Sequence, residues 1–120
     1  MKNHVYWLLQ VAVKDGQLDN LRSLMTEMST ATQNDEPGTL NYEWWIGDDE
    51  KTIHIYERYA DSGAAIIHVG NFGSKFMERF MGAADPTAIT VYGDASPELR
   101  EALAGFGAVH MGAFGGFTRG

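Results

Sequence analysis

The fold is decided by the stretch Glu57-Arg58-Tyr59-Ala60-Asp61-Ser62-Gly63-Ala64-Ala65-Ile66-Ile67-His68. A predicted strand ends within the first residues of this stretch. Asp61 then begins a helix, because an Asp side chain can accept hydrogen bonds from the free N–H groups of the first turn. The i, i+3, i+7 spacing of Asp61, Ala64 and His68 places them along one side of that helix. An imidazole is thus predicted beside a strand that carries Glu57. This arrangement suits a small-molecule site and is also compatible with plain packing.

Working outward from this stretch, the chain alternates between strand and helix patterns. Strands are predicted at residues 5–13, 39–47, 52–59, 87–93 and 108–114, and helices at 17–34, 61–83 and from 97 to about 105. Gly70 and Gly73 interrupt the second helix, so two pieces with an irregular joint are expected there. The order β-α-β-β-α-β predicts an α+β fold of the ferredoxin-like split βαβ type, with an antiparallel sheet and two helices on one face.

Composition narrows the class of protein. The 120 residues suffice for one domain, and 44% hydrophobic with 21% charged residues is ordinary for a globular protein. No apolar run approaches the roughly 20 residues of a membrane span, and the N-terminus has no secretory layout, so a cytoplasmic protein is expected. The absence of cysteine excludes disulfides and thiolate chemistry, while a net charge of −7 disfavours nucleic acid and anionic membranes as partners.

The second face of the predicted sheet is too apolar to remain exposed to solvent. Tyr6, Leu8, Trp45 and Tyr56 lie on the face opposite the expected core, where a sheet covered on one side should be polar. A large apolar face is an association surface, and two copies meeting sheet to sheet would cover it with twofold symmetry. A homodimer is therefore predicted, the alternative being a solvated face with a few isolated apolar residues.

Two series of residues resemble a known family. The first is Glu36-Pro37-Gly38 followed by Leu40 and Tyr42, and the second is Glu57, Asp61, Ala64 and His68 with Phe72 and Phe76 beyond. In order and spacing they resemble the antibiotic biosynthesis monooxygenase family, whose members have dimeric α+β barrel folds. The resemblance covers about residues 5–93, so residues 1–120 are expected to form a single domain in which 97–114 is a C-terminal helix and strand extension. The last strand could pair within its own chain or with a partner.

The resemblance also implies a chemistry. Catalytic members oxygenate polycyclic phenols or quinols without flavin, metal or haem, and the deprotonated substrate itself passes an electron to oxygen. The protein supplies an apolar pocket, hydrogen bonds and a proton acceptor. No cofactor is expected here, and the partner would be a small aromatic molecule. Related chains degrade haem, and many relatives have no demonstrated reaction, so whether this chain is an enzyme stays open.

His68 and Glu57 are the candidate catalytic residues. His68 is the first choice for a general base or proton shuttle, because its ordinary pKa is about 6.5; the alternative is a histidine bonded to a carboxylate or carbonyl that serves the fold. Glu57 could orient His68 or accept a proton, or it could make a buried structural bond.

Six aromatic residues could line the slot for an aromatic ligand, although aromatics are also ordinary core filling. They are Trp7, Tyr42, Trp44, Tyr59, Phe72 and Phe76. No histidine pair has the spacing of a known metal site, and a haem site would need His68 as the proximal ligand. The leading prediction is a cofactor-independent monooxygenase for a small aromatic or quinol-type substrate. The alternatives are a non-catalytic dimer that binds a small ligand and, third, a haem-degrading monooxygenase.

Overall fold

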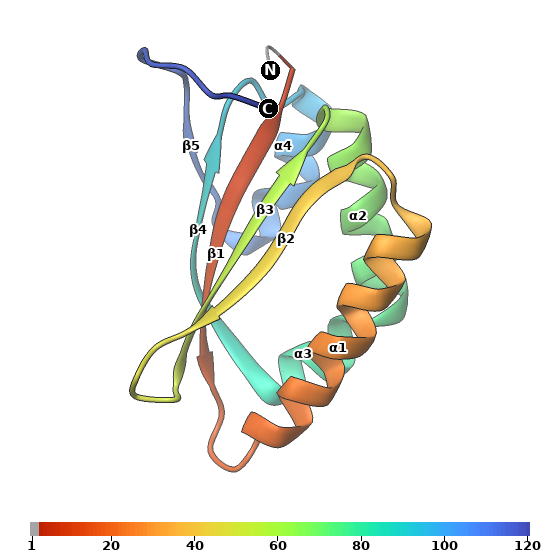
Figure 1. The fold of residues 1–120 in the computed structure, drawn as a ribbon, viewed down its shortest axis with the longest axis vertical. Coiled ribbons are helices and arrows are strands. Elements are labelled where there is room, and N and C mark those ends of the chain that lie inside the picture. Colours follow the sequence, from red (N-terminus) through yellow and green to blue (C-terminus); the bar gives the residue numbers. More distant parts are fainter. Residues whose placement is uncertain (1–2) are drawn as a thin grey trace.

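A computed structural model describes residues 3–120 and places one curved sheet against a layer of helices (Figure 1). The strands are β1 (Val5–Val13), β2 (Thr39–Ile46), β3 (Thr52–Tyr59), β4 (Ala84–Tyr92) and β5 (Val109–Met111). The helices are α1 (Leu18–Asp35), α2 (Ser62–Lys75), α3 (Met77–Ala83) and α4 (Pro97–Leu103), followed by a 3-10 turn, η1 (Ala104–Phe106). Within the described residues, no helix is long and apolar enough to cross a membrane.

The strand order is β2-β3-β1-β4-β5, and the first four strands pair antiparallel. This confirms the predicted ferredoxin-like α+β fold, and the sheet stays open rather than closing into a barrel. The prediction of a wholly antiparallel sheet is wrong at one edge, where β5 runs parallel to β4. The reason is the helical connection: α4 carries the chain back along the sheet, and a helical crossover joins parallel strands.

The second helical region is in two pieces, as predicted, but the joint lies elsewhere. Gly70 and Gly73 are exposed residues inside α2, where each costs only about 1 kcal/mol relative to Ala. The break falls at Phe76, whose φ of −127° is not helical. Phe76 is buried in the core with Phe80. Packing of these side chains therefore decides where the helix turns.

All helices cover one face of the sheet, and the core between them forms two adjoining clusters. The first lies under α1 and α3 and includes Val11, Leu21, Met28, Ile55 and Phe80. The second lies under α2 and α4 and includes Val5, Trp7, Tyr59, Val91 and Leu99. Leu9 packs against both clusters, so it marks the boundary at the middle of β1.

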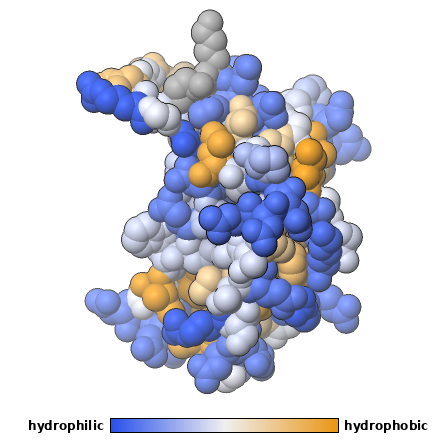
Figure 2. All heavy atoms as spheres, turned by 45° about the vertical axis from the view of Figure 1, so that its right-hand side comes forward, coloured by the Kyte–Doolittle hydropathy of each residue, from blue (hydrophilic) through white to orange (hydrophobic). Residues whose placement is uncertain are grey.

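The surface differs between the two sides of the molecule. In the view that brings the helical side of Figure 1 forward, the surface is mostly hydrophilic and its apolar groups are small and separate (Figure 2). On the uncovered face of the sheet, large apolar side chains are exposed, among them Trp45 (60%), Tyr92 (37%), Val109 (60%) and Met111 (53%). The register places Tyr6, Leu8 and Tyr56, all half-buried, on this same face.

Candidate active site

His68 is placed by the start of α2. The Asp61 side chain accepts a 2.8 Å hydrogen bond from the Ala64 N–H, so the helix begins at Ser62 as the sequence predicts. Two turns later, His68 and Ala65 are the buried residues of this helix and face the sheet. The helix thus delivers the imidazole to the inner side of β3, where Glu57 and Tyr59 point the same way along the strand.

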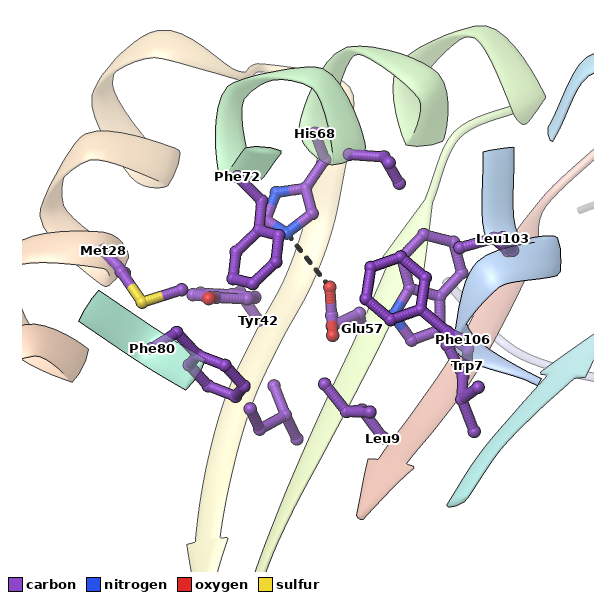
Figure 3. A pocket seen from close by; sticks show the side chains of 13 residues that line it. Trp7, Leu9, Met28, Tyr42, Glu57, His68, Phe72, Phe80, Leu103 and Phe106 are labelled. Carbon is purple, nitrogen blue, oxygen red and sulfur yellow. Dashed lines mark ion pairs between the residues drawn. The ribbon is translucent and has the colours of Figure 1, made fainter. Parts of the chain in front are cut away.

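The imidazole of His68 lies between two carboxylates. Nδ1 is 2.8 Å from Oε1 of Glu36. Nε2 is 3.1 Å from Oε1 of Glu57, the contact that the dashed line in Figure 3 marks. The three side chains are almost fully buried, with 7, 6 and 3% exposure for His68, Glu36 and Glu57. A neutral imidazole carries one N–H and would turn a lone pair toward one carboxylate. Because both nitrogens face carboxylate oxygens, the geometry favours the doubly protonated imidazolium.

Glu36 is held at the junction of α1 and β2. Its backbone N–H bonds to the carbonyl of Thr32 at 3.0 Å, and its side chain accepts from Thr39 Oγ1 and Asn71 Nδ2, each at 3.1 Å. The second oxygen of Glu36 is thereby occupied by the amide of α2, one turn beyond His68. With the His68 bond, three donors surround this buried carboxylate, which is what a buried charge requires.

The approach of this junction to α2 depends on Gly38. A Cβ at Gly38 would lie 2.6 Å from Cβ of Ala64, closer than real contacts allow. The carbonyl of Gly38 also accepts from the Ala60 N–H at 2.9 Å, just before α2 begins. A glycine facing an alanine therefore lets the loop after Glu36 lie directly on the helix that carries His68.

One carboxylate oxygen of Glu57 accepts hydrogen bonds, and the other accepts none from the described residues. Its Oε1 accepts from the Tyr59 hydroxyl at 2.5 Å as well as from His68 Nε2. One oxygen of Glu57 therefore accepts two hydrogen bonds, one for each of its lone pairs. Among residues 3–120, Oε2 forms no hydrogen bond. It is the acceptor that remains for a ligand.

The electrostatics agree with a charged His68. Burial lowers the pKa of the imidazole, but the hydrogen bonds and charges of Glu36 and Glu57 outweigh it and raise the pKa to about 9. Burial opposes the charged form of Glu36, yet its donors, led by His68, lower its pKa. Burial and the charge of Glu57 raise the pKa of Tyr59 and of Tyr42 well above the ordinary range, so both phenols keep their protons.

A cavity of about 50 Å³ lies beside Glu57 and His68, between the sheet and the helices. Its walls are otherwise apolar or aromatic, and Figure 3 shows the Glu57 carboxylate among them. The lining residues are Trp7, Leu9, Met28, Tyr42, Ile55, Val69, Phe72, Phe80, Ile89, Leu103 and Phe106, together with Glu57 and His68. This is a small, mostly apolar pocket with one free carboxylate oxygen and a cation next to it.

Comparison with known proteins places this architecture in a family. The family described as antibiotic biosynthesis monooxygenase matches residues 5–75. The chain belongs to this family. No functionally curated protein matches it.

Among solved structures, MupZ from Pseudomonas fluorescens is similar with a TM-score of 0.86 at 19% identity, covering 98% of this chain and 95% of MupZ. SnoaB from Streptomyces nogalater, a cofactor-independent oxygenase, has a TM-score of 0.66 at 10% identity, covering 78% of this chain and 95% of SnoaB. A putative antibiotic biosynthesis monooxygenase from Bacteroides thetaiotaomicron has a TM-score of 0.64 at 21% identity, covering 79% of this chain and 90% of that protein. At these identities the likeness is one of fold.

In this antibiotic biosynthesis monooxygenase family member, five of the predicted site residues meet at the cavity: His68, Glu57, Trp7, Tyr42 and Phe72. Tyr42 packs edge-on against His68 with ring centroids 5.3 Å apart, and Phe72 packs on Phe80.

The other three predicted residues, Trp44, Tyr59 and Phe76, do not line it. Tyr59 lies behind Glu57 as its hydrogen-bond donor, and Phe76 fills the core at the helix joint. Trp44 lines a separate hollow with Leu18 and Met25 under α1. Strand alternation grouped Trp44 with Tyr42 on one face, as the register confirms. It assigned no face to Tyr59 and could not tell which core cluster each residue would join.

Several residues of the site were not identified as such from the sequence, among them Glu36, Leu103 and Phe106. Glu36 belongs to the quoted Glu-Pro-Gly series, yet its role as the second partner of His68 was not predicted. A signal was present: an acidic residue at the C-terminal end of a helix opposes the helix dipole and needs another reason to be there. Leu103 and Phe106 come from the C-terminal extension, and no local pattern links them to the pocket.

The same geometry bears on the two alternatives that involve a metal, a haem site and a metal-ion site. Both ring nitrogens of His68 are engaged by carboxylates, so neither presents a lone pair to a haem iron in this arrangement. Within residues 3–120, no three histidine or acidic side chains are grouped so as to hold a metal ion.

Proposed function

We propose that this chain is a cofactor-independent monooxygenase acting on a small phenol or quinol. The observation that carries the proposal is the free Oε2 of Glu57, which lies at an apolar cavity while Oε1 is fixed by His68 and Tyr59. A carboxylate within hydrogen-bond reach of a bound hydroxyl is a suitable general base. The His68 imidazolium beside it stabilises the negative charge that deprotonation leaves on the substrate oxygen.

The proposed step needs only the substrate and O₂. Glu57 takes the hydroxyl proton, and the phenolate passes one electron to O₂. The two radicals join through a new C–O bond at a ring carbon that carries hydrogen. The O–O bond then breaks with loss of that ring hydrogen and a proton as water, leaving a quinone. A phenol and O₂ thus give a quinone and one water, with atoms and electrons balanced, and the apolar walls keep solvent from the intermediates.

Turnover is tested by oxygen uptake with a panel of phenols and quinols, with transfer of ¹⁸O from labelled O₂ to the product read by mass spectrometry. The expected result is uptake by the wild type, a loss of about 100-fold or more in Glu57→Gln from removal of the general base, and no change in Glu78→Gln, whose side chain is exposed on α3. Equal uptake by wild type and Glu57→Gln contradicts the proposed role of Glu57.

The small cavity also favours a second candidate, a non-catalytic protein that binds a small ligand. A pocket of about 50 Å³ is well below the roughly 300–1,000 Å³ of typical ligand sites. The Glu36–His68–Glu57 network would then serve to join α1, α2 and β3. Members of the panel that bind, as followed by calorimetry, without any oxygen uptake would establish this candidate in place of the enzyme.

The proposal includes a homodimer formed through the uncovered face of the sheet. The exposed side chains of Trp45, Tyr92, Val109 and Met111 support it, because apolar groups on one sheet face favour association. A twofold axis would let the same face serve both copies. Sedimentation at micromolar concentration is expected to give the mass of two chains, and a single-chain mass would contradict the dimer.

A further inference from the structure

The cavity is closed on one side by the C-terminal extension. Leu103 at the end of α4 and Phe106 in η1 both line it, and Figure 3 shows them on the side of Glu57 away from Phe72 and Phe80. Neither residue lies within the part of the chain that the family matches, which ends at residue 75. The extension thus adds two wall residues to a pocket that the rest of the fold builds.

Leu103 is a fixed wall. It is 2% exposed and packs in the second core cluster with Leu99. The helix that carries it is anchored at its start, where Ser96 Oγ accepts from the Leu99 N–H at 3.2 Å and the Ser96 N–H donates to Ser62 Oγ at 2.9 Å. α4 is therefore tied directly to the first turn of α2, the helix of His68.

Phe106 is held less firmly. It is half-buried in a single 3-10 turn whose neighbours Ala104 and Gly105 are exposed. The turn ends at Gly107, which has a φ of +70°, a conformation that side-chain-bearing residues rarely adopt. A single short turn with few buried contacts opens with the lowest free energy, so this is the part of the wall that moves most easily.

The volume of the cavity limits what fits. About 50 Å³ is a third of the roughly 150 Å³ of an apolar cavity that binds benzene, so even one aromatic ring enters only when a wall side chain shifts. The remaining walls come from the sheet and from α1, α2 and α3, and they include the buried core residues Met28, Ile55 and Phe80. A second ring must therefore take the space that the Phe106 side chain occupies.

We propose that Phe106 sets the size of the substrate, restricting the site to single-ring phenols and quinols. The class of reaction rests on the proposed function, whereas the size limit is a property of the pocket and is read by binding alone. A multi-ring phenol enters the wild-type pocket only by displacing Phe106, and that displacement weakens its binding. Shortening residue 106 opens the cavity toward the exposed turn around Gly105 and admits the second ring.

The test measures binding of phenol, 1-naphthol and 2-anthrol by calorimetry without oxygen, so that turnover plays no part. The wild type is expected to bind phenol at least tenfold more tightly than 1-naphthol or 2-anthrol. Phe106→Ala is expected to bind both larger phenols at least tenfold more tightly than the wild type does, with a much smaller change for phenol. Phe114→Ala removes a phenylalanine of the same tail that is fully exposed, and it should behave as wild type.

Two further variants keep the test decisive. Phe106→Leu covers the case in which Phe106→Ala does not fold, and it should shift the preference in the same direction. Phe106→Trp fills the cavity and should weaken phenol itself. A phenol-to-anthrol ratio that is the same in the wild type and the residue-106 variants overturns the proposal, and so does a wild type that binds none of the three phenols. Absence of oxygen uptake with normal size selection would instead contradict only the proposed function.

Discussion

At the scale of single residues, the site depends on a histidine that is charged at neutral pH rather than poised to accept a proton. His68 was predicted as the base, but two carboxylates already saturate its ring. In the function we propose, Glu57 is the proton acceptor, and His68 holds that carboxylate and supplies positive charge. Glu57 was predicted because it lies near His68 in sequence. Glu36, 32 residues away from His68, depends on a tertiary contact that no local pattern encodes.

Stability should fall with rising pH because of His68. Its pKa in the folded state is about 9, above the unfolded value of 6.5, so its contribution is complete below pH 6.5 and is lost as the pH rises through 9. The shift corresponds to a contribution on the order of 3 kcal/mol. Urea unfolding at pH 6 to 9, below the range in which tyrosines ionise, should show this slope in the wild type and in His54→Gln, but not in His68→Gln. A slope that persists in His68→Gln would contradict it.

Removing the charge of Glu36 should destabilise the fold strongly. Glu36→Gln leaves the buried imidazolium with one carboxylate, and breaking a buried ion pair typically costs about 3–5 kcal/mol. Asp35→Asn is the matched control, because Asp35 is exposed at the preceding position and its charge opposes the helix dipole. Urea midpoints at pH 7 should fall for Glu36→Gln and stay level or rise for Asp35→Asn. Similar midpoints for the two variants would argue against a buried pair.

At the scale of elements, the sequence predicted best where one face of a strand meets the core. β1 and β3 were predicted at their observed ends, because their inward residues alternate with outward ones. The cap Asp61 was also predicted, since it acts on the first turn of its own helix. The start of β4, the break at Phe76 and the parallel direction of β5 were not. Each of these depends on packing between segments rather than on local preference.

The contact between the Glu36 loop and α2 gives a prediction at this scale. Gly38→Ala puts two Cβ atoms 2.6 Å apart and should cost about 1–3 kcal/mol, because loop and helix must separate. Ala64→Gly in the same chain removes the clash and should recover part of the loss. Gly82→Ala is the control, because a Cβ there meets nothing within 4 Å. Additive effects of the two changes in thermal unfolding would contradict the clash.

At the scale of the whole molecule, the proposed homodimer depends on the uncovered face of the sheet. Leu8 lies on the uncovered face of β1, paired with Tyr56 on one side and Thr90 on the other. Leu8→Glu places a charge at the middle of that face and should shift the sedimenting species from two chains to one. Ile67→Glu, on the exposed side of α2, should leave the dimer intact. Dissociation by both variants or by neither would place the interface elsewhere.

The charge state of His68 is measured most directly by ¹⁵N NMR of the imidazole ring over pH 5 to 11. Both ring nitrogens should show the chemical shifts of a protonated imidazolium at pH 7, and the transition should centre near pH 9. In Glu36→Gln the transition should move to lower pH, because one of the two carboxylates that hold the proton is gone. A neutral ring at pH 7 in the wild type would contradict the paired carboxylates, and with them the assignment of Glu57 as the proton acceptor.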